Sequence, residues 1–460
     1  MEKSKLSLRF ASVCMILILC FSIAGCSSGN SASGSGTTAA TDVSGTSGAV
    51  TTTEAVKPVT LKLIAWQNEA TINALNMVTE KVKEKYPNIS MEVNAVDGST
   101  YSQLQQTRLA ANDIDFITNG MYNPVPDWAK GMDKPDWLKF IEAGYILDLT
   151  DQPFLSNWDP VSLRDATTVN GKVYGIDTGK VAYNGVFYSK DIFDKYDLKL
   201  PNNWEEFIAL CEKLKANGVT PLTGSGKNSG DVNFLANGFI NANVSDPVAF
   251  EQALWDGSKK YTDPDVVAIY KKLYQFFSYY EKDFTNVDYA SVPGRFVAGK
   301  AAMYADGTWQ AAQISAVDPN FKFGYFAIPG DATGAGPQQL AGKYDVQIAV
   351  VANSPNKDEC LKWLSVLSEK DVYSEYVNIV GFIPTMKGIT IKNEFLNELA
   401  PLNVNFQKNF ELIQKLPKGI GKFGGFIPTM YKIIGGTVNT PEELAAASQK
   451  DWDDAMKALK

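Results

Sequence analysis

The chain of 460 residues contains no histidine, and this absence excludes several kinds of chemistry. Catalysis by a serine or cysteine that a histidine activates is excluded, as are histidine-ligated zinc and the usual proton shuttle of neutral pH. Cysteine is scarce, and Cys211 and Cys360, which lie far from the N-terminus, lack the spacing of a metal site. The net charge is −8 and acidic and basic residues are mixed, so we expect no nucleic acid partner.

Long apolar runs are missing too, apart from one near the N-terminus. Lys3, Lys5 and Arg9 precede an apolar segment at 10–23, which is too short to span a bilayer and is typical of a signal peptide. This segment runs into Ile-Ala-Gly-Cys, ending at Cys26, which resembles the lipobox of bacterial lipoproteins. The resemblance implies cleavage before Cys26 and lipidation of its sulfur. Ordinary cleavage beside an incidental cysteine is the alternative.

The next segment, residues 27–56, cannot form a packed core. Of its 30 residues, 19 are Ser, Gly or Thr, and only Asp42 and Glu54 are charged. Such a composition predicts a flexible tether. We therefore assign 1–25 to a signal peptide and 26–58 to the lipidated cysteine and tether. This arrangement would hold a folded domain at the outer face of the cell membrane, beside a partner embedded in that membrane.

The folded part begins with a β-α-β pattern. Residues 60–66 read as a buried strand, 71–86 as an amphipathic helix that Pro87 ends, and 89–95 as a second strand. Such a unit forms a parallel sheet, and the loop after its first strand lies at the edge where ligands bind. A chain of this length is too long for one ordinary core, so we expect two large lobes.

The segment 295–310 carries the most informative motif. A helix is predicted to end at Gly299, a short strand to follow at 301–304, and Trp309 to lie just past the strand. The segment resembles the pattern F-x-x-GKAAM-x-x-x-G-x-W of the bacterial extracellular solute-binding proteins that serve ABC sugar importers. Taken alone, it also fits a core helix, strand and turn with a structural tryptophan.

Further segments match the same family in the correct order, over most of residues 59–385. Asp177 stands where the family has a proline and Ser189 where it has an asparagine, so the match is not literal. The matching segments are AGYILDLT at 143–150, GKVYGID at 171–177, VFYSKDIF at 186–193 and PNNWEEF at 201–207.

The resemblance implies an α/β, two-lobed periplasmic-binding-protein-like fold of type II. Each lobe would be a sheet flanked by helices, and a hinge of several chain crossings would join the lobes. The crossings are expected near Tyr183, at 344–347 and after Phe382. The implied boundaries are 59–182 and 346–385 for lobe one, and 183–345 and 386–460 for lobe two.

Proteins recognise sugars with aromatic faces, which cover the apolar side of the ring, and with polar side chains that bind its hydroxyls. The loops predicted to face the cleft supply both kinds of side chain, and Trp309 is the leading candidate because it matches the family's motif. The candidate ligand-binding residues are Trp66, Asn68, Glu69, Asn119, Tyr122, Asp177, Tyr183, Asp306, Trp309, Tyr344, Asp345 and Phe382.

The resemblance implies an extracellular lipoprotein that captures a mono- or oligosaccharide between its lobes and delivers it to the permease of an ABC importer. It would act as a monomer, without a metal or cofactor, and would make or break no bond. Two alternatives stay open. One is a binding protein for another polar solute, such as a polyamine or a metal chelate. The other is a surface glycoside-active enzyme, for which no acid and nucleophile or base can be assigned.

Overall fold

The computed structural model describes residues 57–119, 125–129, 131–132, 134–227, 229–331 and 339–459. The predicted signal peptide, Cys26, nearly all of the tether and Tyr122 therefore lie outside the described residues. Within 56–460, the described residues form one compact unit. None of the helices in the described part combines the length and apolar character that crossing a bilayer requires.

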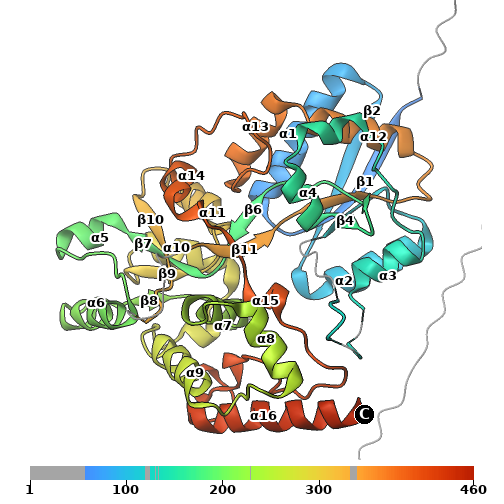
Figure 1. The fold of residues 1–460 in the computed structure, drawn as a ribbon. Coiled ribbons are helices and arrows are strands. Elements are labelled where there is room, and N and C mark those ends of the chain that lie inside the picture. The colour runs from blue at the N-terminus through green and yellow to red at the C-terminus, as the bar shows by residue number, and fades with distance from the viewer. Residues whose placement is uncertain are drawn as a thin grey trace, which may run out of the picture. The chain divides into compact units, whose positions relative to one another are not determined.

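Three strands from the N-terminal part of the chain and one from the segment 347–350 build a four-stranded sheet in the order β12-β3-β1-β2 (Figure 1). Strand β1 pairs in parallel with β2 and β3, and β12 closes the edge antiparallel to β3. The predicted β-α-β opening is confirmed. The elements are β1 (Val59–Trp66), α1 (Glu69–Lys85), β2 (Ile89–Val96), β3 (Phe116–Asn119) and β12 (Gln347–Val350).

Helices cover both faces of this first sheet (Figure 1). Leu61 and Leu63 of β1 pack against α1, α12 (Lys357–Leu367) and α13 (Lys370–Val380). Ile64 points to the opposite face, against α2 (Gly98–Ala111) and α3 (Asp136–Glu142). This alternation follows from the two-residue period of a strand, and it places apolar side chains in two separate layers.

A second four-stranded sheet has the order β10-β7-β9-β8. Its strands are β7 (Gly185–Ser189), β8 (Leu222–Thr223), β9 (Met303–Ala305) and β10 (Phe323–Ala327). Val186 packs into the larger core, which also holds side chains from α6 (Trp204–Ala216), α9 (Pro264–Phe277) and α16 (Pro441–Ala458). Phe187 packs on the other face, with α10 (Val292–Val297), α11 (Gln310–Val317) and α14 (Glu394–Leu399).

A small third sheet, β13-β11-β6, lies where the chain crossings were predicted. Strand β6 (Lys180–Ala182) ends directly before Tyr183, and β11 (Ala341–Tyr344) and β13 (Gln407–Lys408) complete the sheet. Gly342 is required in β11, because a Cβ there would lie 1.7 Å from the carbonyl oxygen of Val181. The segment after Phe382, where the third crossing was predicted, also contacts β6. Lys180 and Ile383 exchange two backbone hydrogen bonds. The lobe boundaries themselves remain predictions.

Cys211 and Cys360 are free, and they are buried in two separate cores. Shorter elements connect the sheets and helices described above. The connecting elements are η1 (Pro153–Asn157), α4 (Pro160–Ala166), β4 (Thr168–Val169), β5 (Lys172–Val173), α5 (Lys190–Lys195), α7 (Ser229–Asn243), α8 (Pro247–Asp256), η2 (Phe284–Asn286), η3 (Tyr289–Ser291), η4 (Ala400–Asn403), α15 (Phe410–Ile413), η5 (Pro428–Met430) and η6 (Lys432–Ile434).

Candidate functional site

Three elements that are far apart in the sequence bring Trp66, Trp309 and Lys343 together. Trp66 ends β1, Trp309 is the residue before α11, and Lys343 lies on β11. The ammonium of Lys343 lies 5.9 Å from the ring centre of each indole. Both distances are within the range of a cation–π interaction. Two of the predicted ligand-binding residues therefore face the same lysine, which sequence reasoning had not selected.

Both indoles are held in place by contacts that leave them partly exposed. Trp66 stacks on Tyr101, with ring centres 4.4 Å apart. The Nε1 of Trp309 donates to the hydroxyl of Tyr289 at 2.6 Å, and its ring lies 5.7 Å from that of Tyr183. These contacts orient two flat apolar surfaces, which is what a sugar-binding platform requires.

Asp306 is linked to Trp309 through the hydroxyl of Tyr289. Its carboxylate accepts hydrogen bonds from the Tyr304 hydroxyl at 2.5 Å, from the backbone N–H of Gly307 at 2.6 Å and from the Tyr289 hydroxyl at 3.4 Å. Asp306 is only 8% exposed. Its contacts are therefore those of a residue that positions Tyr289, and through Tyr289 the indole. Its predicted contact with a ligand remains a prediction.

Two carboxyl groups lie near Lys343. Asp345 forms an ion pair with its ammonium at 3.2 Å. Glu411 belongs to a distant segment, and burial of its carboxyl raises the pKa, while Lys343 and the hydroxyl of Tyr183 lower it. Burial also raises the pKa of Tyr183 well above its usual range, so this hydroxyl stays protonated. The centre of the site thus offers hydrogen-bond donors and acceptors side by side.

Helix capping and core packing account for the places of three more predicted residues, Asn68, Glu69 and Phe382, whose ligand-binding roles remain predictions. Asn68 caps α1, because its side-chain oxygen accepts a hydrogen bond from the backbone N–H of Thr71 at 3.0 Å. This cap explains why α1 begins at Glu69, two residues before the predicted start. Glu69 is exposed in the first turn, where a negative charge is favourable. Phe382 is buried in the core of the first sheet.

Asp177 and Tyr344 both lie near side chains of α4, which are Ser162 for Asp177 and Asp165 for Tyr344. Asp177 is fully buried, and neither carboxylate oxygen has a partner at hydrogen-bond geometry. Burial raises the pKa of Asp177 to about 7, against smaller lowering effects of Thr385 and Ser162. Burial, with the charge of Asp165, raises the pKa of Tyr344. For Asn119 the structure describes only the backbone, which ends β3. The ligand-binding roles of these three residues remain predictions.

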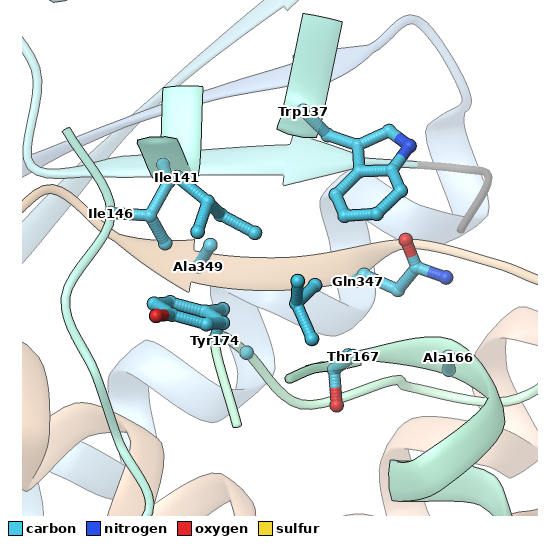
Figure 2. A pocket seen from close by; sticks show the side chains of 10 residues that line it. Trp137, Ile141, Ile146, Ala166, Thr167, Tyr174, Gln347 and Ala349 are labelled. Carbon is cyan, nitrogen blue, oxygen red and sulfur yellow. The ribbon is translucent and has the colours of Figure 1, made fainter. Parts of the chain in front are cut away.

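A pocket lies on one face of the first sheet, at the edge strand β12 (Figure 2). Its empty space is about 350 Å³, part of which is open to solvent. The indole of Trp137, the ring of Tyr174 and the amide of Gln347 line it, together with Ile141, Ile146 and Ala349. Sequence reasoning did not select this pocket, because its walls come from α3, Ile146, β12 and the segment 166–175.

Sequence reasoning also missed Lys343, Tyr289 and Glu411. Lys343 directly precedes the predicted Tyr344, so its position was the one available signal. Tyr289 and Glu411 lie in segments that carry no motif, and only the folded chain brings them to the site. Across the described ranges, no group of three Asp, Glu, Cys or His side chains is arranged to hold a metal ion.

Residues 65–373 match the family of bacterial extracellular solute-binding proteins, and the chain belongs to this family. The multiple sugar-binding protein of Streptococcus mutans serotype c is 26% identical over 343 residues, which cover 71% of this chain and 76% of that protein. An uncharacterized ABC transporter extracellular-binding protein of Pyrococcus horikoshii is 22% identical over 401 residues, 84% of either chain.

Solved structures of the type II binding-protein fold match as well. The solute-binding protein RafE in complex with raffinose superposes with a TM-score of 0.67 at 20% identity, over 86% of this chain and 100% of that one. A chitin oligosaccharide binding protein superposes with a TM-score of 0.69 at 21% identity, over 87% and 99%. The predicted α/β, two-lobed periplasmic-binding-protein-like fold is therefore confirmed.

Proposed function

We propose that the chain is the substrate-binding lipoprotein of an ABC importer and that it captures a mono- or oligosaccharide in the cleft between its lobes. The observation that carries the proposal is the convergence of Trp66 and Trp309 on Lys343. The names of the relatives support a carbohydrate ligand, because one is a multiple sugar-binding protein and one solved structure holds raffinose. The chain binds and releases its ligand without making or breaking a bond.

The chemistry of this site suits an uncharged polyhydroxy ring. The two indoles present flat apolar faces to the C–H side of a sugar. The ammonium of Lys343 and the carboxyls of Asp345 and Glu411 supply donors and acceptors for hydroxyl groups. A ligand that contacts both lobes stabilises the closed arrangement and shifts the population toward it. The small third sheet, which joins the proposed lobes, is the expected hinge.

A lipid anchor would keep the protein beside a permease in the membrane. We infer that Cys26 carries a lipid and that residues 27–58 tether the folded part, as a monomer, to the outer face of the cell membrane. The sequence at the end of the apolar segment supports this inference. Labelling of the protein in cells with a lipid precursor, compared with Cys26→Ser, tests it. Equal labelling of the two proteins would contradict it.

Thermal melting of residues 56–460 against a panel of mono- and oligosaccharides tests the proposed function. A ligand that binds only the native state stabilises it by about 2.7 kcal/mol at a hundredfold excess over its Kd. We expect one sugar to raise the melting temperature of the wild type and to have no such effect on Trp309→Ala. The control is Trp128→Ala, which removes a partly exposed indole that packs on Trp255 instead.

A second candidate ligand is a cationic solute such as a polyamine. Two indoles around an ammonium, with two carboxyls nearby, form the kind of site that binds such cations. In that case Lys343→Met would strengthen binding of spermidine, because it removes the competing charge. A panel in which only polyamines raise the melting temperature would select this candidate, and turnover of an oligosaccharide would instead indicate an enzyme.

A further inference from the structure

One apolar segment crosses from the first sheet to the core of the second. Residues 125–132 lie between β3 and α3, and both of these elements belong to the first sheet and the helices that cover it. The apolar side chains of this segment pack instead against the larger core of the second sheet, and they are Val125, Trp128, Ala129 and Met132. The described residues of this stretch, 125–129 and 131–132, are called the latch segment below.

The latch segment contacts two helices of the second sheet's core, α8 and α16. Ala129 is only 1% exposed within this core. The ring of Trp128 meets the ring of Trp255 on α8 edge-on, with ring centres 6.1 Å apart. Gly131 approaches Leu459, the C-cap of α16, so closely that a Cβ would lie 2.5 Å from a methyl carbon of this leucine. These contacts bury apolar surface between two parts of the molecule that different sheets organise.

The tryptophan that the latch segment contacts is fixed to the site around Lys343. The Nε1 of Trp255 donates to the carbonyl oxygen of Lys415 at 2.8 Å. The backbone N–H of Lys415 donates in turn to the carboxylate of Glu251, which lies on α8 like Trp255, at 2.8 Å. Lys415 follows α15, the helix that carries Glu411. Buried hydrogen bonds therefore hold α8 to the segment that brings Glu411 to the site.

The latch contacts belong to the same arrangement of the chain as the convergence of the two indoles on Lys343. Strands β1 and β3 run parallel, so their ends, Trp66 and Asn119, lie at one edge of the first sheet. The latch segment follows Asn119 in the sequence, and Trp309 lies just after β9 of the second sheet. A movement that separates the two sheets would therefore break the latch contacts and draw the two indoles apart.

We propose that the latch segment holds the two parts of the molecule together before any ligand binds, so that most of the free protein already has this arrangement. The contacts that carry the inference are made by the chain alone. A site that is already assembled loses less free energy on binding, so the latch segment would raise the affinity and slow release. This consequence for binding rests on the proposed function, whereas the consequence for the free protein does not.

Distances between two spin labels in the sugar-free protein test the latch. Asn76→Cys in α1 and Ala209→Cys in α6 place the labels on exposed helix surfaces of the two parts, in the compact unit of residues 56–460. The native Cys211 and Cys360 are buried and free, so the reagent modifies the introduced thiols. Pulsed electron paramagnetic resonance measures the distribution, and we expect one dominant distance.

Trp128→Ala should raise the fraction of molecules with longer distances about two- to tenfold, the range for the loss of one aromatic pair. Leu459→Ala removes the contact with Gly131 from the opposite side, and we expect a change in the same direction. Trp137→Ala is the matched control, because this partly exposed tryptophan lines the pocket at β12 and should leave the distances unchanged. Melting temperatures verify that each variant is folded.

Two results would refute the latch: equal distributions in the wild type, Trp128→Ala and Leu459→Ala, or a wild type in which long distances already dominate. A panel of mono- and oligosaccharides then tests the proposed function on the same labelled proteins. Trp128→Ala keeps every side chain proposed to contact the sugar, so a saturating sugar should restore its shorter distance. If no sugar changes any distribution or melting temperature, the proposed function fails, while a difference between the sugar-free proteins still supports the latch.

Discussion

At the scale of single residues, the site depends on side chains that hold its two indoles. Tyr289 accepts the hydrogen bond of Trp309 Nε1 and in turn donates to Asp306. The hydroxyl therefore links the indole to a carboxylate that is buried and already bonded to Tyr304. The sequence analysis selected the two residues at the ends of this hydrogen-bonded series, Asp306 and Trp309, but it did not select Tyr289 between them.

Tyr289→Phe removes this link and keeps the ring. We expect the affinity for the sugar to fall about two- to tenfold, because one hydrogen bond that orients Trp309 is lost. The melting temperature of the unliganded protein should hardly change, since Tyr289 is partly exposed. Isothermal titration measures the affinity, with Tyr196→Phe as a control on a partly exposed tyrosine in α5's C-cap. Unchanged affinity in Tyr289→Phe would show that the link has no role in binding.

Asp177 makes stability depend on pH. Its folded pKa of about 7 lies above the ordinary value of 3.8, because burial disfavours the charge. Between pH 4 and 7 the native protein keeps a proton that the unfolded chain has lost, so the stability falls as pH rises and levels off above 7. Each unit of the shift corresponds to about 1.4 kcal/mol. Asp177→Asn carries no charge and should lose this part of the dependence.

Urea unfolding of both proteins at pH 4.5 and pH 8 measures the effect. We expect Asp177→Asn to be more stable than the wild type at pH 8 and similar to it at pH 4.5. Glu251, whose pKa burial raises to about 8, contributes a parallel fall in both proteins and cancels in the difference. The exposed Asp151→Asn serves as the control. A difference that does not change between the two pH values would refute the assignment.

At the scale of elements, features that depend on local sequence were easier to predict than features that depend on tertiary packing. Local sequence features mark the starts of α6 and α9: the side-chain oxygen of Asn203 accepts a hydrogen bond from the N–H of Glu206, and Pro264 is the first residue of α9. The β-α-β opening was also predicted, because its periodicity is strong. The strand before Trp309 begins at Met303 rather than Ala301. Such ends depend on pairing with β7 and β8, which a single segment does not reveal.

The candidate site was predicted only in part, for a related reason. The family motif selected Trp309 and the first strand-to-helix loop selected Trp66, and the structure brings both indoles beside Lys343, while their contact with a ligand remains a prediction. Such signals do not indicate which way a side chain turns. Asp177 points into the interior, where Tyr373 and Thr385 lie, and Asn68 turns back to its own helix. Long-range partners such as Glu411 need the folded chain.

Asn68 allows a test that separates a helix cap from a ligand contact. Asn68→Ala should destabilise the protein by about 1 kcal/mol, because the N–H of Thr71 loses its acceptor. Asn68→Asp restores the cap and should restore the stability. If the side-chain amide also binds the sugar, the affinity of Asn68→Asp should stay low although its stability returns. Chemical denaturation and titration of the three proteins distinguish these cases. Full stability in Asn68→Ala would contradict the cap.

At the scale of the whole molecule, a ligand held between two lobes should stabilise both of them. The protein contains its own reporters for this, since Cys211 lies in the larger core of the second sheet and Cys360 in a core of the first. Both thiols are free and fully buried, and burial raises the pKa of each. A thiol reagent can therefore modify them only when the surrounding core opens.

We expect saturating sugar to slow the labelling of both cysteines in residues 56–460, by about a hundredfold at a hundredfold excess over Kd if opening abolishes binding. Mass spectrometry of the peptides around Cys211 and Cys360 measures the two rates separately under mild denaturant. Trp309→Ala should show no slowing at either position. If sugar protects only one cysteine, the ligand stabilises a single core and capture between two lobes is wrong. Protection of both, lost together in the variant, requires that the same bound ligand couples the two cores.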